Sequence, residues 1–283
     1  MINKENNFLV VGLGLMGGSY SERLTEKGYK VYAIDINQES LEIGKRRKMI
    51  LNQDESEEEL IRKADYIILG LRPTLCLPWI KEHVKLLKKG AIITDMMGVK
   101  SHFVKDIQDF LVDQELISMH PMTGKEVSGV AYASSNIFNS SNMLIVPTSK
   151  NTERGKEFAH ELGTILGVKN ITEVSIEEHD KVVGYVSHLS HVISVILMTC
   201  FDSKSIATCA GTAFKDITRI ANINEDIWSE IFKENQDELL PLIDSFETSL
   251  KTFKEALEKG ELDKIKEILK ESKNKRLAYI ENK

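Results

Sequence analysis

Short runs of apolar residues alternate with longer amphipathic stretches through the first half of the chain. Five runs have the length and composition of buried strands, at residues 8–12, 31–35, 66–70, 91–95 and 116–120. Segments with helical spacing, such as 18–28 and 38–48, lie between them. Apolar strands separated by helix-length segments are typical of parallel βαβ units, because helices cover both faces of such a sheet. Two further runs, around Leu144 and Ile171, are expected to add strands at one edge.

The second half of the chain has helical periodicity and no further strand pattern. Ser175 and Glu178 have the spacing of a capping box at the start of a long apolar helix. Apolar residues recur at helical spacing again over residues 225–259. We therefore predict a Rossmann-like α/β domain with a mostly parallel sheet over residues 1–172, followed by an all-helical domain over residues 173–283.

The long apolar helix also has the length of a membrane span. Residues 182–201 contain no Asp, Glu, Lys or Arg, and about twenty such residues can cross a bilayer. The stretch also contains histidines and serines, which are costly in lipid, and a single central span is an unusual topology for an otherwise charged chain. We interpret it as a helix buried on all sides, in part against a second copy of the chain, and expect no membrane partner.

Composition narrows the class of protein further. The 283 residues, 42% hydrophobic and 28% charged, suit a soluble globular protein with one large domain or two smaller ones. The net charge of −6 leaves no basic excess for a nucleic-acid partner. The three cysteines show no CxxC spacing, and the first residues lack the apolar core of a signal peptide. A cytoplasmic location is therefore expected.

A glycine-rich motif follows the first expected strand and opens the first expected helix. Its glycines allow a tight turn, the approach of a pyrophosphate to the backbone, and close packing of helix on strand. Asp35 ends the next strand, where a carboxylate can bind a ribose 2′-hydroxyl and repel a 2′-phosphate. We therefore predict dinucleotide binding, with NAD favoured over NADP. The residues expected to bind the cofactor are Gly12, Gly14, Leu15, Met16, Gly17 and Asp35.

His120 stands at the end of the fifth expected strand and is followed by a loop that contains Pro121 and Gly124. In open α/β sheets, ligands bind in the crevice at the carboxyl ends of the strands. A histidine there can exchange protons near neutral pH. We therefore predict a role for His120 in the chemistry, although a structural role is common for a lone histidine.

Charged and titratable groups also lie in the helical half. Lys215 and Arg219 are four residues apart and share one face of an expected helix. They form either a surface ion network or a substrate site, since arginine can hold a carboxylate with two hydrogen bonds. His188 and His191 lie three apart on the apolar helix, where core or interface positions are the expected roles. No metal site is predicted.

Five segments together resemble the prephenate dehydrogenase family, in the right order and over nearly the whole chain. They are residues 12–19 (GLGLMGGS), 64–73 (ADYIILGLRP), 120–129 (HPMTGKEVSG), 179–191 (HDKVVGYVSHLSH) and 212–235. The resemblance implies an NAD-binding domain, a helical domain that forms a homodimer, and NAD-dependent oxidative decarboxylation of prephenate to 4-hydroxyphenylpyruvate in tyrosine biosynthesis. Neither a chorismate mutase segment before residue 1 nor an ACT-type domain after residue 283 is expected.

The resemblance also implies roles for individual residues. His120 would hydrogen-bond the ring hydroxyl of the substrate and accept its proton as hydride leaves the same carbon. Arg219 would bind a substrate carboxylate, and His191 would lie near the pyruvyl end of the substrate. Glu126 and Lys215 would help to close the site.

One position departs from the family pattern. Relatives carry a serine in a D-x-G-S-x-K pattern after the fourth strand, whereas residues 95–100 read DMMGVK here, so that Gly98 supplies no hydroxyl. Ser101 is a nearby candidate to replace it at the substrate. The absence of the serine also keeps open a non-catalytic protein that binds NAD and senses redox state.

Two other enzyme classes remain alternatives. Arogenate differs from prephenate only by an amine in place of the keto group, so arogenate dehydrogenase is not separated from prephenate dehydrogenase by these residues. A β-hydroxyacid dehydrogenase shares the plan of a Rossmann domain followed by helices. That class relies on a lysine from an interdomain helix and gives no reason for the HPMTG sequence that begins at His120.

Overall fold

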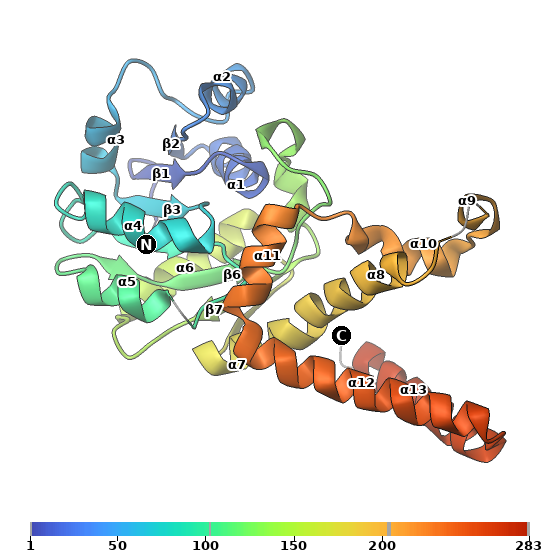
Figure 1. Ribbon diagram of the computed structural model, residues 1–283. Coiled ribbons are helices and arrows are strands. Elements are labelled where there is room, and N and C mark those ends of the chain that lie inside the picture. The colour runs from blue at the N-terminus through green and yellow to red at the C-terminus, as the bar shows by residue number, and fades with distance from the viewer. Residues whose placement is uncertain (1, 102, 203–204, 282–283) are drawn as a thin grey trace. The chain divides into compact units, whose positions relative to one another are not determined.

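The computed structural model describes residues 2–101, 103–202 and 205–281. The chain divides into two compact units, Met1–Gln236 and Asp237–Lys283. The first unit contains the α/β region together with the first helices of the segment predicted to be all-helical (Figure 1).

A five-stranded parallel sheet forms the centre of the α/β region, with the strand order β2-β1-β3-β4-β5. Figure 1 shows β2, β1 and β3 next to one another. The strands are β1 (Asn7–Val11), β2 (Lys30–Ile34), β3 (Tyr66–Leu69), β4 (Ile92–Asp95) and β5 (Glu115–Leu116). The helices between them are α1 (Leu15–Glu26), α2 (Gln38–Arg46), α3 (Glu57–Lys63), α4 (Pro73–His83) and α5 (Val104–Phe110). Strand order reverses at β1 and β3, and such a switch point is where this class of sheet binds ligands.

Alternate residues of β1 enter two separate hydrophobic cores. Phe8 and Val10 belong to the core that also contains Leu24 of α1. Leu9 and Val11 belong to the other core, which is built with α3, α4 and α5. Both faces of β1 are therefore buried, which explains why its sequence is apolar without interruption.

A second sheet of three strands follows, and it corrects one expectation. It consists of β6 (Ser118–Pro121), β7 (Asn142–Val146) and β8 (Asn170–Glu173), with β6 antiparallel and β8 parallel to β7. The runs around Leu144 and Ile171 were expected at the edge of the first sheet, and this expectation is wrong. The run at 116–120 is divided after Ile117, whose N–H is the last to pair with β4, and the following residues pair with β7 instead.

Three further elements complete the region between these strands and the helical segment. They are the 3₁₀ turns η1 (Val130–Tyr132) and η2 (Ser135–Phe138) and the helix α6 (Glu153–Leu166). In the antiparallel pair, His120 of β6 stands opposite Leu144 of β7, which fixes the position of this histidine.

The long apolar helix is made of α7 (Ile176–Val183), the π-helical segment η3 (Gly184–Leu189) and α8 (Ser190–Thr199). The Ser175 side chain accepts the Glu178 N–H at 3.1 Å, as the expected cap requires. However, Tyr185 is 61% exposed and Ile196 is 57% exposed, so one chain alone does not bury this helix on all sides, and its burial against a second copy stays a prediction. One chain leaves part of its apolar surface uncovered.

Among the described residues, the helix at Ile176–Thr199 is long and apolar enough to cross a membrane, and 28% of its most apolar stretch is buried. A core helix of a soluble protein can have the same length and hydropathy.

The remaining helices of the first unit are α9 (Ile206–Cys209), α10 (Thr212–Thr218), the 3₁₀ turn η4 (Arg219–Ala221) and α11 (Glu225–Glu234). The helix predicted over 225–259 is interrupted at Asn235, after which α12 (Gln236–Glu258) begins. The second unit consists of most of α12 and α13 (Leu262–Glu281). Gly260 separates these two helices with a φ of +69°, a conformation that favours glycine.

Candidate active site

A cavity of about 830 Å³ lies where the strands of the first sheet end and helix α1 begins. Its volume falls within the usual range for sites that bind cofactors and small molecules. The wall is formed by the turn after β1, the residues that follow β3 and β4, the loop after β6, the π-helical segment η3 and the segment from η4 to α11. The residues that line it include Gly14, Leu15, Met16, Gly17, Gly98, His120, Glu126, His188, His191, Arg219 and Trp228.

The three glycines of the motif have different surroundings. Gly12 has a φ of +93°, and a Cβ added there would lie 2.5 Å from the carbonyl oxygen of Gly70. A Cβ on Gly17 would lie 2.0 Å from the carbonyl oxygen of Gly12. A Cβ on Gly14 would meet no atom within 4 Å, because this glycine faces the cavity. Gly12 and Gly17 therefore allow the turn, and Gly14 leaves space for a ligand.

The amino-terminal end of α1 opens into the cavity. Gly14 is the residue before the helix and has no side chain to cap it, and Leu15, Met16 and Gly17 follow in the first turn. The first N–H groups of a helix have no partner within the helix and carry partial positive charge. This uncharged first turn and the open space at Gly14 fit the pyrophosphate of a dinucleotide.

Asp35 holds the glycine turn against the end of β2. One carboxylate oxygen accepts the N–H of Leu13 at 2.6 Å, and the other accepts the N–H of Asn37 at 2.8 Å. Asp35 and Gly12 are not among the residues that line the cavity. The carboxylate is held at the end of β2 by these two bonds, which is the position from which the sequence predicts contact with a ribose.

His120 begins a chain of three side chains that leads into the protein interior. Its Nδ1 lies 2.9 Å from Nε2 of His179, and Nδ1 of His179 lies 2.7 Å from Oδ1 of Asp180. His179 and Asp180 are fully buried. Burial lowers the pKa of His120 well below its ordinary value, and the neighbouring His179 and the charge of Lys100 act in the same direction. His120 is therefore neutral at neutral pH.

A buried ion pair lies directly beneath this chain. Lys100 and Asp95 are both fully buried and form an ion pair between Nζ and Oδ1. Lys100 also donates to the carbonyl oxygen of Met119 at 2.8 Å, and the Ser118 hydroxyl donates to the second oxygen of Asp95 at 2.5 Å. The pair thereby ties the end of β4 to β6, the strand that carries His120.

A second histidine faces the same part of the cavity. The amide nitrogen of Asn235 lies 3.0 Å from the carbonyl oxygen of Asp180 and 2.9 Å from Nδ1 of His188. A carbonyl only accepts, so the amide nitrogen is the donor in both bonds and His188 carries its proton on Nε2. Burial lowers the pKa of His188 to about 4, which keeps the ring neutral.

Gly98 lies between the two imidazoles. A Cβ added there would lie 3.7 Å from Nε2 of His120 and 3.9 Å from Nε2 of His188. The two Nε2 atoms therefore face one space. Nε2 of His188 is a donor there, and Nε2 of His120 is an acceptor if the proton of its ring is on Nδ1.

Charged groups and a large aromatic ring also line the cavity. Arg219 pairs with Glu126, and the arginine side chain is 64% exposed. The ring of His191 packs against that of Trp228, with centroids 3.7 Å apart. Nδ1 of His191 lies 2.8 Å from the carbonyl oxygen of Ser187, so this nitrogen donates and Nε2 is free to accept.

The structure brings together some of the residues singled out in the sequence and separates others. His120, Glu126, His191 and Arg219 all line the cavity, as do Gly14, Leu15, Met16 and Gly17. Gly12 and Asp35 do not line it, and neither do Lys215 and Ser101. Lys215 is exposed on α10 one turn before Arg219, and the Ser101 hydroxyl donates to Asp180 and so is directed away from the cavity.

Five site residues were not predicted as such from the sequence: His179, Asp180, His188, Trp228 and Asn235, of which His188 was expected only at a core or interface position. A signal existed for the first two, because a histidine and an aspartate stand next to each other at the start of an otherwise apolar helix. Asn235 gave no signal, since it reads as one polar position in a long helical pattern.

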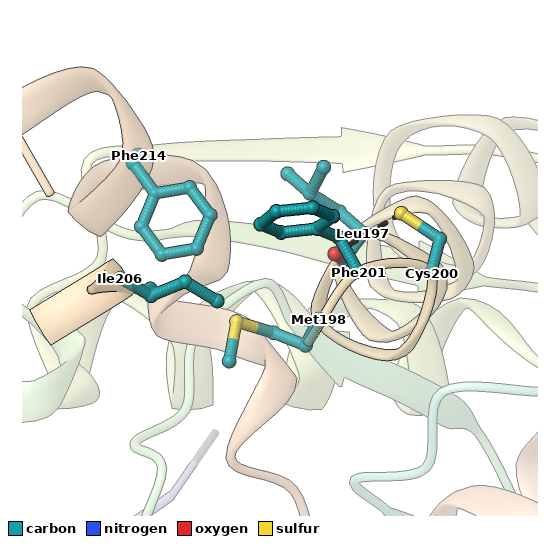
Figure 2. Close-up of a pocket in the computed structure, with 6 residues that line it drawn as sticks. All are labelled: Leu197, Met198, Cys200, Phe201, Ile206 and Phe214. Atoms are coloured by element: carbon teal, nitrogen blue, oxygen red, sulfur yellow. Dashed lines mark hydrogen bonds between the residues drawn. The ribbon is translucent and has the colours of Figure 1, made fainter. Parts of the chain in front are cut away.

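A second, smaller cavity of about 150 Å³ lies between the end of α8, α9 and α10. Figure 2 shows that its walls are apolar side chains and one thiol. They are Leu197, Met198, Cys200, Phe201, Ile206 and Phe214. The Cys200 thiol donates to the carbonyl oxygen of Leu197 at 3.4 Å, and the described residues that line this cavity include no His, Asp, Glu, Lys or Arg. Among the described residues, no three His, Cys, Asp or Glu side chains gather as a metal site would require.

Two family models match the chain. The model described as "Prephenate dehydrogenase, nucleotide-binding domain" matches residues 21–171, more than half of the 283 residues. The model described as "Prephenate dehydrogenase, dimerization domain" matches residues 175–271. The chain belongs to the prephenate dehydrogenase family. This confirms the resemblance seen in the motifs.

Individual members of the prephenate dehydrogenase family match the chain along most of its length. It is 28% identical to the cyclohexadienyl dehydrogenase of Zymomonas mobilis, covering 95% of this chain and 94% of that protein. It is also 28% identical to the prephenate dehydrogenase of Lactococcus lactis, over 95% of this chain and 76% of that protein.

A solved structure of a prephenate dehydrogenase from A. aeolicus, in complex with hydroxyphenyl propionate and NAD+, superposes with a TM-score of 0.88. It is 30% identical and covers 98% of this chain and 99% of that chain. The predicted fold class, a Rossmann-like α/β region followed by helices, is confirmed by this match and by the two family models.

Proposed function

We propose that this protein is an NAD-dependent oxidoreductase that converts prephenate to 4-hydroxyphenylpyruvate and CO2 in tyrosine biosynthesis. The observation that carries the proposal is the position of His120, a neutral imidazole whose Nε2 faces the cavity into which the amino-terminal end of α1 also opens. A proton acceptor next to a dinucleotide site is what the oxidation of an alcohol requires.

The cofactor site is proposed for the residues that the glycine motif predicts. NAD+, when bound, accepts a hydride. The first turn of α1, at Leu15, Met16 and Gly17, would hold its pyrophosphate, and Gly14 would leave room for it. Asp35 at the end of β2 would bind the adenine ribose and repel a 2′-phosphate. NAD is therefore the preferred cofactor.

His120 would accept the proton of the ring hydroxyl while hydride leaves the carbon that carries it. The oxygen becomes a carbonyl, and the ring carboxylate then leaves as CO2 because its bonding electrons pass through the ring to that oxygen. The product is an aromatic phenolate, to which His120 would return the proton. Prephenate dianion and NAD+ thus give 4-hydroxyphenylpyruvate monoanion, CO2 and NADH, with no net release of a proton.

His188 would assist at the same oxygen. Its Nε2–H faces the space that His120 Nε2 also faces, at Gly98. A donor there would hold the hydroxyl with its proton directed at His120. A fixed donor at an oxygen that gains charge is a common source of transition-state stabilisation. We propose that His188 does so in the absence of a side-chain hydroxyl at Gly98.

The substrate side chain would be held by the charged part of the cavity lining. We propose that Arg219 binds its carboxylate, with Glu126 paired to the same guanidinium and His191 at the pyruvyl end. Lys215, an exposed cation one turn before Arg219, would add to the attraction of a dianion. Ser101 would act only through Asp180, to which its hydroxyl donates.

We further propose that two copies of the chain form a homodimer through the apolar face of the helix made of α7, η3 and α8. The family model over this region describes a dimerization domain, and Tyr185 and Ile196 are exposed there in the single chain. A cytoplasmic location is proposed because the three cysteines are free, two of them exposed. Neither a nucleic acid nor a membrane is proposed as a partner.

The test is a side-by-side assay of prephenate and arogenate, each with NAD and with NADP, following the absorbance of the reduced nicotinamide and the release of CO2. The proposal expects turnover of prephenate with NAD. Turnover of arogenate alone would make the protein an arogenate dehydrogenase. Binding of NAD with no turnover of either substrate would overturn an enzymatic function and favour a redox sensor.

A further inference from the structure

We propose that His179 and Asp180 are positioning residues that fix which ring nitrogen of His120 carries the proton. This inference rests on the proposed role of His120 as the base. That role requires the proton on Nδ1 of His120 and a bare Nε2 toward the cavity. A free histidine in water holds its proton mainly on Nε2, so the protein must select the other tautomer.

The series of hydrogen bonds that selects the tautomer of His120 begins at Asp180. One oxygen of its carboxylate lies 2.7 Å from Nδ1 of His179, and the two oxygens also accept the N–H of Lys100 at 2.9 Å and the N–H of Ser101 at 2.8 Å. The Ser101 hydroxyl adds a further donor. Burial acts to raise the pKa of Asp180, but hydrogen bonds from His179 and Ser101 hold it below its ordinary value. Asp180 is therefore an ionised acceptor, and Nδ1 of His179 must donate to it.

The second step passes from His179 to His120. Burial lowers the pKa of His179, with Asp180 acting in the opposite direction, so its ring is neutral at neutral pH. A neutral imidazole has one N–H, and Asp180 takes it on Nδ1. Nε2 of His179 then holds a lone pair 2.9 Å from Nδ1 of His120. Nδ1 of His120 must donate, and Nε2 of His120 is left without a proton.

Each member of this chain is held by a separate part of the fold. His120 lies on β6, which the buried Lys100–Asp95 pair ties to the end of β4. His179 and Asp180 lie on α7, and Asn235 binds the carbonyl oxygen of Asp180 at 3.0 Å. The charged groups that face the two imidazoles are thus Lys100, Asp95 and Asp180, all inside the protein. Because His179 and Asp180 are fully buried, we expect the ionised carboxylate of Asp180 to set the direction of these hydrogen bonds.

The direct test reads the tautomers without any turnover. Two-dimensional NMR of the full chain with ¹⁵N-labelled histidine, at pH 7.5 and without ligands, distinguishes protonated from bare ring nitrogens. The expected result is a proton on Nδ1 and none on Nε2 for both His120 and His179. A proton on Nε2 of His120 would overturn the proposal. This readout is separate from the dehydrogenase assay, which tests the proposed function alone.

Asp180→Asn tests the direction of the chain. An amide nitrogen can donate to Nδ1 of His179, which reverses both hydrogen bonds and places a proton on Nε2 of His120. We expect kcat/KM for prephenate to fall by about a hundredfold or more, the scale for losing a general base, with the Kd for NAD unchanged. Asp109→Asn removes an exposed carboxylate that pairs with Lys150 and serves as the matched control.

Two variants at position 179 distinguish the effect of hydrogen bonding from the effect of packing. The amide of His179→Gln can accept from His120 and donate to Asp180, whereas His179→Leu can do neither. The glutamine variant should retain at least about ten times the kcat/KM of the leucine variant, on the scale of one hydrogen bond to a charged group. Equal activity of the two variants would overturn the proposal. His160→Gln, at an exposed histidine, is the control, and the NMR of the unaltered protein decides the matter if a variant does not fold.

Discussion

A single nitrogen atom, Nε2 of His120, carries the proposed chemistry, because it faces the cavity while the rest of the ring is engaged with the interior. His120→Asn replaces the imidazole with an amide that cannot take a proton at neutral pH. We expect kcat for prephenate to fall by about a hundredfold or more. The Kd for NAD, measured by calorimetry, should stay the same. An unchanged kcat would remove His120 from the mechanism.

Arg219 is the residue proposed to recognise the substrate. Arg219→Gln keeps a polar side chain and removes the charge. The KM for prephenate should rise by about ten- to a hundredfold, as expected for a charge-assisted hydrogen bond worth about 1.5–3 kcal/mol, with a smaller change in kcat. Lys215→Gln should raise KM less, because Lys215 lies outside the cavity wall. A rise confined to the KM for NAD would contradict the assignment of Arg219.

The buried His188 links stability to pH. Its pKa is about 4 in the folded protein and 6.5 when unperturbed, so the unfolded chain binds the proton more readily. Its contribution to stability is therefore complete above pH 6.5 and is lost as the pH falls toward 4, by on the order of 3 kcal/mol. Urea unfolding between pH 7 and pH 4 should show this loss. In His188→Gln the loss should be smaller, and an equal loss would contradict the link.

At the level of elements, the turn from β1 into α1 separates glycines that shape the backbone from one that faces the ligand. Gly17→Ala would place a Cβ 2.0 Å from the carbonyl oxygen of Gly12 and should destabilise the fold by about 3 kcal/mol. Gly14→Ala meets no atom within 4 Å, so stability should change by less than about 0.5 kcal/mol. Its Cβ would occupy the proposed pyrophosphate space.

The two variants are compared by thermal unfolding and by calorimetric titration with NAD. For Gly14→Ala we expect a Kd at least about ten times higher at an unchanged Tm, since a tenfold change corresponds to about 1.4 kcal/mol. For Gly17→Ala we expect a lower Tm. Full NAD affinity in Gly14→Ala would contradict the position given to the pyrophosphate.

Elements differ in how well their sequence predicts them. The strands at Phe8 and Val31 are buried on the faces that their apolar runs indicate, and the glycine motif is read from a local pattern. The run at 116–120 was harder to assign to a sheet, because its division after Ile117 depends on pairing with β7, which follows more than twenty residues later. Local pattern predicts that a strand exists, and pairing between distant segments decides its sheet.

At the level of the whole molecule, the same limit applies to the site. His120 was predicted as a site residue because it stands at the carboxyl end of a strand, where open α/β sheets bind ligands. The residues around His120 were not predicted, because His179 is 59 residues away along the chain and Asn235 lies a further 56 residues beyond it. Such contacts arise only when α7 and the end of α11 reach the same point as β6.

Burial of the apolar helix is a property of the assembled protein. Residues 182–201 carry no charged side chain, yet Ile196 remains 57% exposed in the single chain. A second copy would cover such side chains, each worth about 1.5–3 kcal/mol when fully buried. We therefore expect sedimentation equilibrium to give twice the mass of the 32.0 kDa chain.

Ile196→Asp tests whether this face forms the contact. A carboxylate buried in an apolar interface without a partner is strongly unfavourable, so the variant should dissociate at concentrations where the unaltered protein is dimeric. Val112→Asp, at an 89% exposed position in the α/β region, is the matched control and should remain dimeric. If Ile196→Asp stayed dimeric with an unchanged dissociation constant, the contact would lie on another face of the chain, and the exposed apolar helix would need a different explanation.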